Sequence, residues 1–124
     1  MPVKSTLKMY AAIICNTNQN IMAIIGLLSK DVITKTRIFD ALEEQGHQIT
    51  TITSPIFDSS GFDLILVDLD DPVALLVLKN QAHKCLAFGS ANEEDKLKAA
   101  RLSGCDRVYK HGEFFKKILP KLKI

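Results

Sequence analysis

Short apolar segments of strand length alternate with segments of helical periodicity along this chain, and this alternation constrains its fold most. Segment 21–28 reads IMAIIGLL, 62–69 reads FDLILVDL and 85–89 reads CLAFG, so these predicted strands are apolar almost throughout. Strands that are apolar on both faces are typical of a parallel sheet that helices cover on both sides. We predict strands at residues 21–28, 48–53, 62–69, 85–89 and 106–109, and helices at 31–45, 71–84, 90–103 and 113–122.

Five strands in about 100 residues, joined by right-handed crossovers, predict a doubly wound α/β fold of the flavodoxin type with strand order 2-1-3-4-5. In such sheets the functional crevice lies beyond the carboxyl ends of the strands, beside the first strand. The candidate functional residues are therefore those that follow Leu28, Val67, Phe88 and Val108.

The composition limits the class of protein. The chain has 124 residues, of which 47% are hydrophobic and 24% charged, with a net charge of +2. This predicts one globular domain rather than a disordered chain, and so small a charge gives no reason to expect a nucleic-acid partner. The three cysteines have no paired spacing, so neither a disulfide scaffold nor a cysteine zinc site is expected, and free thiols suit the cytoplasm.

The first 20 residues do not follow the alternation. An apolar run at residues 9–15 is interrupted by polar residues 16–20, so no membrane-spanning helix is predicted and no membrane partner is expected. We expect residues 1–20 to form a tail or an extra edge segment, and residues 21–124 to form the domain.

Carboxylates gather at the end of the third predicted strand. Between Thr51 and Leu78 there are five aspartates and no lysine or arginine, and Asp68, Asp70 and Asp71 lie within four residues. Carboxylates that converge at strand ends suit a hard cation such as Mg²⁺, and a carboxylate there can also act as a nucleophile in phosphoryl transfer. Asp70 and Asp71 can instead begin the next helix and complement its dipole. Asp68 follows directly on a buried strand, where an acid without a partner is costly.

Two stretches resemble the receiver domain of two-component response regulators, the CheY-like family. Residues 62–72, FDLILVDLDDP, are similar to the receiver's third strand, which carries the phosphoacceptor aspartate. Residues 88–108 are similar to its fourth strand, its fourth helix and the turn before its fifth strand, with Phe114 and Phe115 following before a Leu-Pro pair. The resemblance implies a receiver fold, a role in phosphorelay signalling and Asp68 as the phosphoacceptor.

The chain departs from the receiver pattern after the first strand. Receivers carry an acidic pair there, and the matching positions are Lys30 and Asp31. The lost acid predicts that Mg²⁺ binds weakly or not at all, while the ammonium of Lys30 can neutralise Asp68 in its place. Asp31, Asp68 and the main-chain carbonyl of Asp70 remain as a candidate metal set.

Two further departures concern the fourth and fifth strands. A receiver ends its fourth strand on Thr or Ser, whose hydroxyl senses the phosphoryl group, and here that position is Gly89. Ser90 follows one residue later, and with Glu93 it also forms a capping box that can begin the next helix. The lysine that receivers place after the fifth strand corresponds to Lys110 or His111, depending on a gap of one residue.

Three hypotheses for function follow. The first is a stand-alone, degenerate receiver, not an enzyme, that works by protein–protein contact. Its partner would be a histidine kinase or another signalling protein, or a second copy joined through the fourth helix, fifth strand and fifth helix. The second is a phosphorylatable single-domain response regulator with Asp68 as acceptor. The third is a small-molecule-binding flavodoxin-like protein that uses the crevice around Asp31 and Asp68, although the common nucleotide-phosphate motifs are absent.

Overall fold

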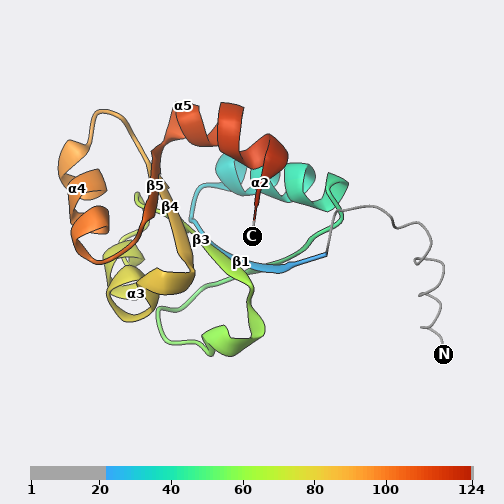
Figure 1. Cartoon of the computed structure of the whole chain (residues 1–124), viewed down its shortest axis with the longest axis horizontal. Helices are drawn as coiled ribbons and strands as arrows, with labels where there is room; N and C mark the ends of the chain where they lie inside the picture. The colour runs from blue at the N-terminus through green and yellow to red at the C-terminus, as the bar shows by residue number, and fades with distance from the viewer. Residues whose placement is uncertain (1–21, 124) are drawn as a thin grey trace.

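The computed structural model describes residues 22–123, which form one parallel sheet of five strands in the order β2-β1-β3-β4-β5 (Figure 1). All four strand pairs are parallel, so the predicted doubly wound order is confirmed. The predicted tail or edge segment at residues 1–20 lies outside the described residues, as does the first residue of the first predicted strand. The strands are β1 (Ile24–Leu28), β2 (Gln48–Thr51), β3 (Leu64–Asp68), β4 (Cys85–Gly89) and β5 (Arg107–Lys110).

Helices cover both faces of the sheet. The longer helices are α2 (Val32–Glu44), α3 (Ala74–Gln81) and α4 (Glu94–Leu102), and the C-terminal helix runs through α5 (His111–Glu113), a π-helical stretch (Phe114–Ile118) and a final 3-10 turn (Leu119–Lys121). Short 3-10 turns at Ser59–Gly61 and Ala82–Lys84 precede β3 and β4. Figure 1 shows α2 and the C-terminal helix on one side of the strands, with α3 and α4 on the other.

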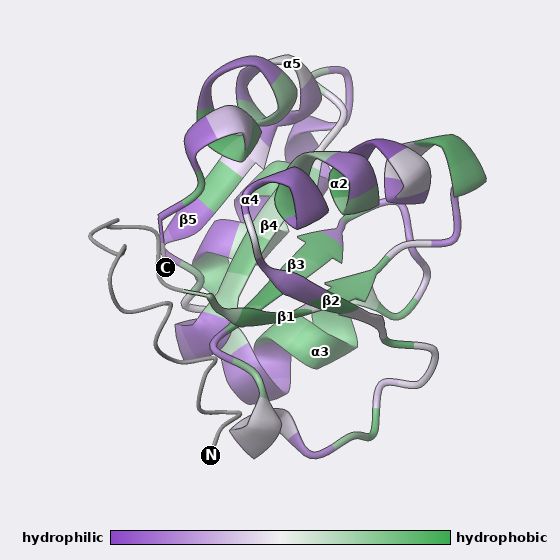
Figure 2. Cartoon of the chain, turned by 90° about the vertical axis from the view of Figure 1, so that its right-hand side faces the viewer, coloured by the Kyte–Doolittle hydropathy of each residue, from purple (hydrophilic) through white to green (hydrophobic). Residues whose placement is uncertain are grey.

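This arrangement creates two hydrophobic cores. Residues of α3 and α4 pack against Ile65 and Val67 of β3, whereas residues of α2 and the C-terminal helix pack against Leu64 and Leu66. Successive strand residues point to opposite faces, so a strand between two helix layers must be apolar at every position. Every residue of β3 and β4 is buried, and Figure 2 shows this central region largely in the hydrophobic colour.

The helices begin at different residues than predicted. Helix α4 begins at Glu94 with Glu93 as N-cap, so the predicted capping box at Ser90 is wrong. The Ser90 hydroxyl instead accepts a hydrogen bond from the Asn92 backbone N–H within a short turn, which delays the helix. The C-terminal helix begins at His111, two residues before the predicted start, directly after the last residue of β5.

Two glycines end helices as expected from their freedom to adopt positive φ. Gly46 follows α2 with φ +90° and Gly104 follows α4 with φ +101°. Each turns the chain back toward the amino end of the next strand, so the carboxyl ends of the strands meet at one edge. Among residues 22–123, no helix is both long and apolar enough to span a membrane.

Candidate functional site

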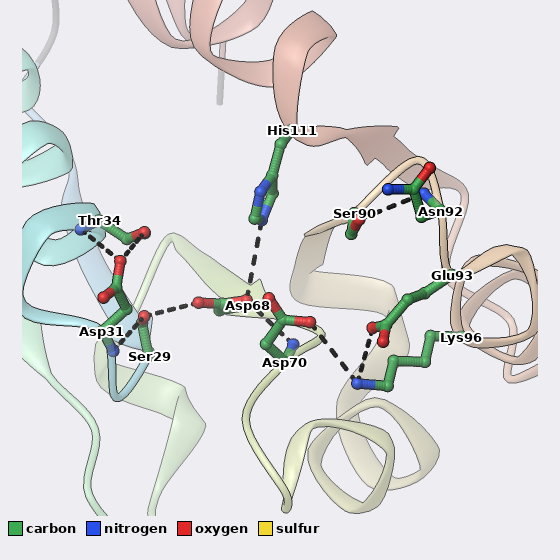
Figure 3. A network of polar contacts seen from close by, with 10 residues as sticks. All are labelled: Ser29, Asp31, Thr34, Asp68, Asp70, Ser90, Asn92, Glu93, Lys96 and His111. Carbon is green, nitrogen blue, oxygen red and sulfur yellow. Dashed lines mark hydrogen bonds and ion pairs between the residues drawn. The ribbon is translucent and has the colours of Figure 1, made fainter.

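Asp68 is the last residue of β3 and lies at the centre of a polar cluster at the carboxyl edge of the sheet (Figure 3). The residue is only 2% exposed. Its Oδ2 accepts a hydrogen bond of 2.7 Å from the Ser29 hydroxyl, and its Oδ1 accepts one of 3.0 Å from the Asp70 backbone N–H. The Nε2 atom of His111 faces the same Oδ1 from 4.0 Å away. Asp68 is thus a buried acid that already has two internal donors.

The surroundings of Asp68 favour its protonated form more than water does. Burial raises the pKa of this carboxyl, and the hydrogen bonds from Asp70 and Ser29 oppose the rise only in part. The negative charge of Asp70 adds to the rise, and His111 acts against it. Asp68 is accordingly a weaker acid than an aspartate in water.

Asp31 lies near this cluster but its carboxylate has another role. It is the N-cap of α2, and its Oδ2 accepts hydrogen bonds from the Thr34 backbone N–H at 3.0 Å and from the Thr34 hydroxyl at 2.6 Å. These bonds hold the pKa of Asp31 below its usual value. Figure 3 shows the carboxylate of Asp31 directed toward Thr34, away from Asp68.

Lys30 is exposed and borders a cavity of about 460 Å³ between the ends of β1 and β2 and the turn after β3. Lys35, Thr51 and Asp71 also line this cavity. Within the described part of the chain, no ion pair joins Lys30 to Asp68, and the nitrogen side chain that faces Asp68 is the imidazole of His111.

Gly89 stands where receivers carry a hydroxyl at the end of the fourth strand, and another side chain packs against it. A Cβ atom built on Gly89 would lie 3.1 Å from both Cβ and Cδ1 of Leu69, which is 4% exposed. Leu69 therefore crowds position 89, and a threonine or serine there would require this leucine to move by a few tenths of an ångström. The Ser90 hydroxyl is used in the turn before α4, as described above.

The register of β5 separates Lys110 from His111. Lys110 pairs with Gly89 at the end of β5 and is exposed, whereas His111 is the first residue of α5. The His111 ring packs 5.5 Å from the Phe88 ring and 6.1 Å from the Phe115 ring, measured between centroids. This aromatic contact directs the imidazole over the carboxyl edge toward Asp68 (Figure 3).

Asp70 connects the cluster to α4. Its carboxylate lies 3.5 Å from the Lys96 ammonium, which also lies 2.8 Å from Glu93. Both partners in the Asp70 ion pair are more than two-fifths exposed, so the pair contributes little stability. One ligand-type atom from each of Asp68, Asp70 and His111 lies within 4.8 Å of the other two, a spacing that can hold a metal ion.

The structure thus brings together the side chains of Asp68, Asp70 and His111. The side chains of Lys30, Asp31 and Lys110 make no hydrogen bond or ion pair to these three in the described part of the chain. Sequence reasoning gave no role to Ser29 or Lys96. The signal for Ser29 is its place directly after β1, because the pairing of Leu28 with Val67 sets the next residues, Ser29 and Asp68, side by side. Lys96 had no comparable signal, because its contact depends on where α4 begins.

Comparisons with known proteins support the fold. No family model matches the chain, and no curated protein matches its sequence. Solved structures do match. One is a response regulator from Thermotoga maritima, with 12% identity and a TM-score of 0.60 over 80% of this chain and 92% of that one. Another is the Mn²⁺-bound form of response regulator Rcp1, with 14% identity and a TM-score of 0.63 over 79% and 89%.

A third match is the receiver domain of Ssk1 from Saccharomyces cerevisiae, solved in complex with the histidine phosphotransfer protein Ypd1. It is 16% identical with a TM-score of 0.60, over 76% of this chain and 81% of that one. At these identities the likeness concerns the fold. The strand order 2-1-3-4-5 and the two helix layers agree with it. The chain has the CheY-like fold of response-regulator receiver domains.

Proposed function

We propose that this chain is a receiver-type signalling domain that acts by docking to other proteins and is not switched by phosphorylation of Asp68. It is a cytoplasmic, non-enzymatic domain in this proposal. The receiver fold supports a place in two-component signalling, and the departures at the carboxyl edge support the degenerate form.

The packing of Leu69 against Gly89 carries this proposal. A receiver switch needs a hydroxyl at the end of β4 that can move toward a phosphoryl group. Here the position has no side chain, and a buried leucine fills the adjoining space. A phosphoryl group on Asp68 would meet no sensor at that place, so the modification would have no route to the α4–β5–α5 face.

The environment of Asp68 supports the same reading. Its oxygens accept hydrogen bonds from Ser29 and from the Asp70 backbone, and burial raises its pKa. Both carboxylate oxygens are therefore already engaged within the fold, in place of the contacts that a phosphoryl-transfer site would make. The acidic partner expected after β1, Asp31, is engaged with Thr34.

The docking surface in this proposal is the face formed by α4, β5 and the C-terminal helix. Leu102 on α4 is 78% exposed, a high value for a large apolar side chain. Lys110 at the end of β5 and Lys116 and Lys117 in the C-terminal helix are also exposed. An exposed leucine on α4 and exposed lysines on the other two elements suit the acidic surface of a signalling partner such as a histidine kinase or phosphotransfer protein, and a second copy of the chain is the alternative partner.

A phosphorylatable regulator is the second candidate, and the position of Asp68 at the end of β3 favours it. Incubation with acetyl phosphate and Mg²⁺, followed by intact mass spectrometry, separates the two. We expect no added phosphoryl group. A phosphoryl adduct that is lost in Asp68→Asn and retained in Asp106→Asn, an exposed aspartate before β5, would refute the degenerate reading.

Amide NMR adds a structural readout. With Mg²⁺ and beryllofluoride, a mimic of aspartyl phosphate, we expect no saturable shifts that extend from residue 68 to β5. For the docking face, sedimentation over a concentration series compares the wild type with Leu102→Glu. Self-association that Leu102→Glu abolishes identifies a second copy as partner, whereas unchanged association in the variant contradicts this choice of face.

A further inference from the structure

Three side chains from separate parts of the chain converge at the carboxyl edge with the donors of a metal site. Asp68 ends β3, Asp70 lies in the turn that follows, and His111 begins α5. One ligand atom of each lies within 4.8 Å of the other two. The set contains two carboxylate oxygens and one imidazole nitrogen.

We propose that Asp68, Asp70 and His111 bind a divalent first-row transition ion such as Zn²⁺ or Co²⁺ in preference to Mg²⁺. This inference goes beyond the docking role and does not depend on it. Its ligands also differ from the magnesium ligands that the receiver resemblance implies, because they do not include Asp31 and they include His111.

The donor types favour this choice of ion. Mg²⁺ prefers oxygen ligands in a near-ideal octahedron and gives up its waters reluctantly. Imidazole nitrogen is a ligand for Zn²⁺, Co²⁺ and related ions, whose affinity for a mixed nitrogen and oxygen site follows the Irving–Williams order. A site with one histidine and two aspartates also leaves positions for water or for a ligand from a partner.

The geometry around His111 is a second, independent observation. Its Nε2 atom is buried and has no hydrogen-bond partner in the described part of the chain, although it faces Asp68 Oδ1 at 4.0 Å. This separation is too long for a hydrogen bond. Two ligands on one tetrahedral ion with bonds of about 2.1 Å lie about 3.4 Å apart, so a small inward movement of the ring suffices.

Charge also favours an ion at this position. Asp68 and Asp70 place two carboxylates close together, and Asp68 is only 2% exposed, so that its charge has little access to water. A divalent ion balances both. The ammonium of Lys96 competes with the metal ion for Asp70, because it already lies 3.5 Å from the Asp70 carboxylate. When the ion binds, Lys96 must move away or remain close to another positive charge.

Calorimetric titration of the whole chain with Zn²⁺, Co²⁺ and Mg²⁺ tests the proposal, with the Co²⁺ absorption spectrum as a readout of the ligand sphere. We expect saturable, equimolar binding of Zn²⁺ and Co²⁺ that is tighter than binding of Mg²⁺. His111→Asn should weaken Zn²⁺ binding by at least about 100-fold, since loss of a direct ligand exceeds loss of an outer partner. The matched control is His83→Asn, an exposed histidine in the turn before β4.

Asp70→Asn removes a second ligand at a side chain that is 48% exposed, so this variant tests the site even where His111→Asn perturbs the aromatic packing. Lys96→Met should tighten Zn²⁺ binding because it removes the competing charge. The titrations are repeated in a Cys15→Ser background so that thiol binding is separated. Absence of saturable binding, a preference for Mg²⁺, or Zn²⁺ affinity that survives His111→Asn would each overturn the proposal.

Discussion

Substitution of Gly89 by threonine would introduce the strand-four hydroxyl of a receiver, and the structure predicts that the protein becomes less stable. The new Cβ would lie 3.1 Å from Cβ and Cδ1 of Leu69 and 3.5 Å from its Cγ. The near atom is the leucine Cβ, which cannot move without the backbone, and Leu69 is 4% exposed. Overpacking of this kind costs about 1–3 kcal/mol.

Threonine is favoured over glycine in a strand, which offsets the cost by up to about 1 kcal/mol. Taking the middle of the cost range and the full offset, we expect Gly89→Thr to lower the free energy of unfolding by about 1 kcal/mol. Because the chain has no tryptophan, urea unfolding followed by far-UV circular dichroism is the appropriate assay. A variant as stable as the wild type would refute the argument that Leu69 blocks this position.

A double-mutant cycle makes the test specific to this contact. Leu69→Ala alone should cost about 2–5 kcal/mol, because it leaves a cavity in a buried region. In the double variant the threonine occupies part of that cavity, so the loss should be smaller than the sum by about 0.5–3 kcal/mol. Additive effects would show that the two positions do not compete for the same space.

Three further predictions concern polar side chains that make hydrogen bonds within the fold, each measured by urea unfolding. The pKa of Asp68 is raised by burial, so the stability that its protonated form contributes is present below the ordinary aspartate pKa and is lost as the pH rises through the folded value. Asp68→Asn should therefore gain stability relative to the wild type as the pH rises above the ordinary aspartate pKa. A constant difference would contradict this. Ser29→Ala leaves Asp68 Oδ2 without its donor and should cost about 1–3 kcal/mol at neutral pH. His47 accepts a hydrogen bond from the Ala23 N–H through Nδ1, and burial lowers its pKa, so stability should fall as the pH drops below the ordinary histidine value. His47→Asn should flatten that slope.

Much of the fold was predictable because its signals are local. The apolar strands, the helical periodicity and the glycines after α2 and α4 each depend on a few neighbouring residues, and they predict the parallel sheet and its order. The predicted start of α4 was wrong, and the cause is also local. A serine followed by a glutamate three residues later suits a capping box, but Ser90 forms a competing turn with Asn92.

Only those residues of the candidate site that directly follow a strand could be predicted from the sequence. Asp68 follows a buried apolar run, so its place at the carboxyl edge can be read from the chain. Which groups surround it depends on pairing between distant segments. Ser29 reaches Asp68 through the register of β1 and β3, and the choice between Lys110 and His111 depends on the register of β4 and β5.

The sequence by itself determined the fold class, the edge of the sheet where chemistry is expected and the acid at its centre. The tertiary structure alone decided which neighbours that acid has. Periodicity specifies which face of an element is apolar, but a difference of one residue in register changes which side chain meets Asp68. Likewise, only packing shows that Leu69 fills the space beside Gly89 and that the imidazole of His111, rather than an ammonium, faces the carboxylate.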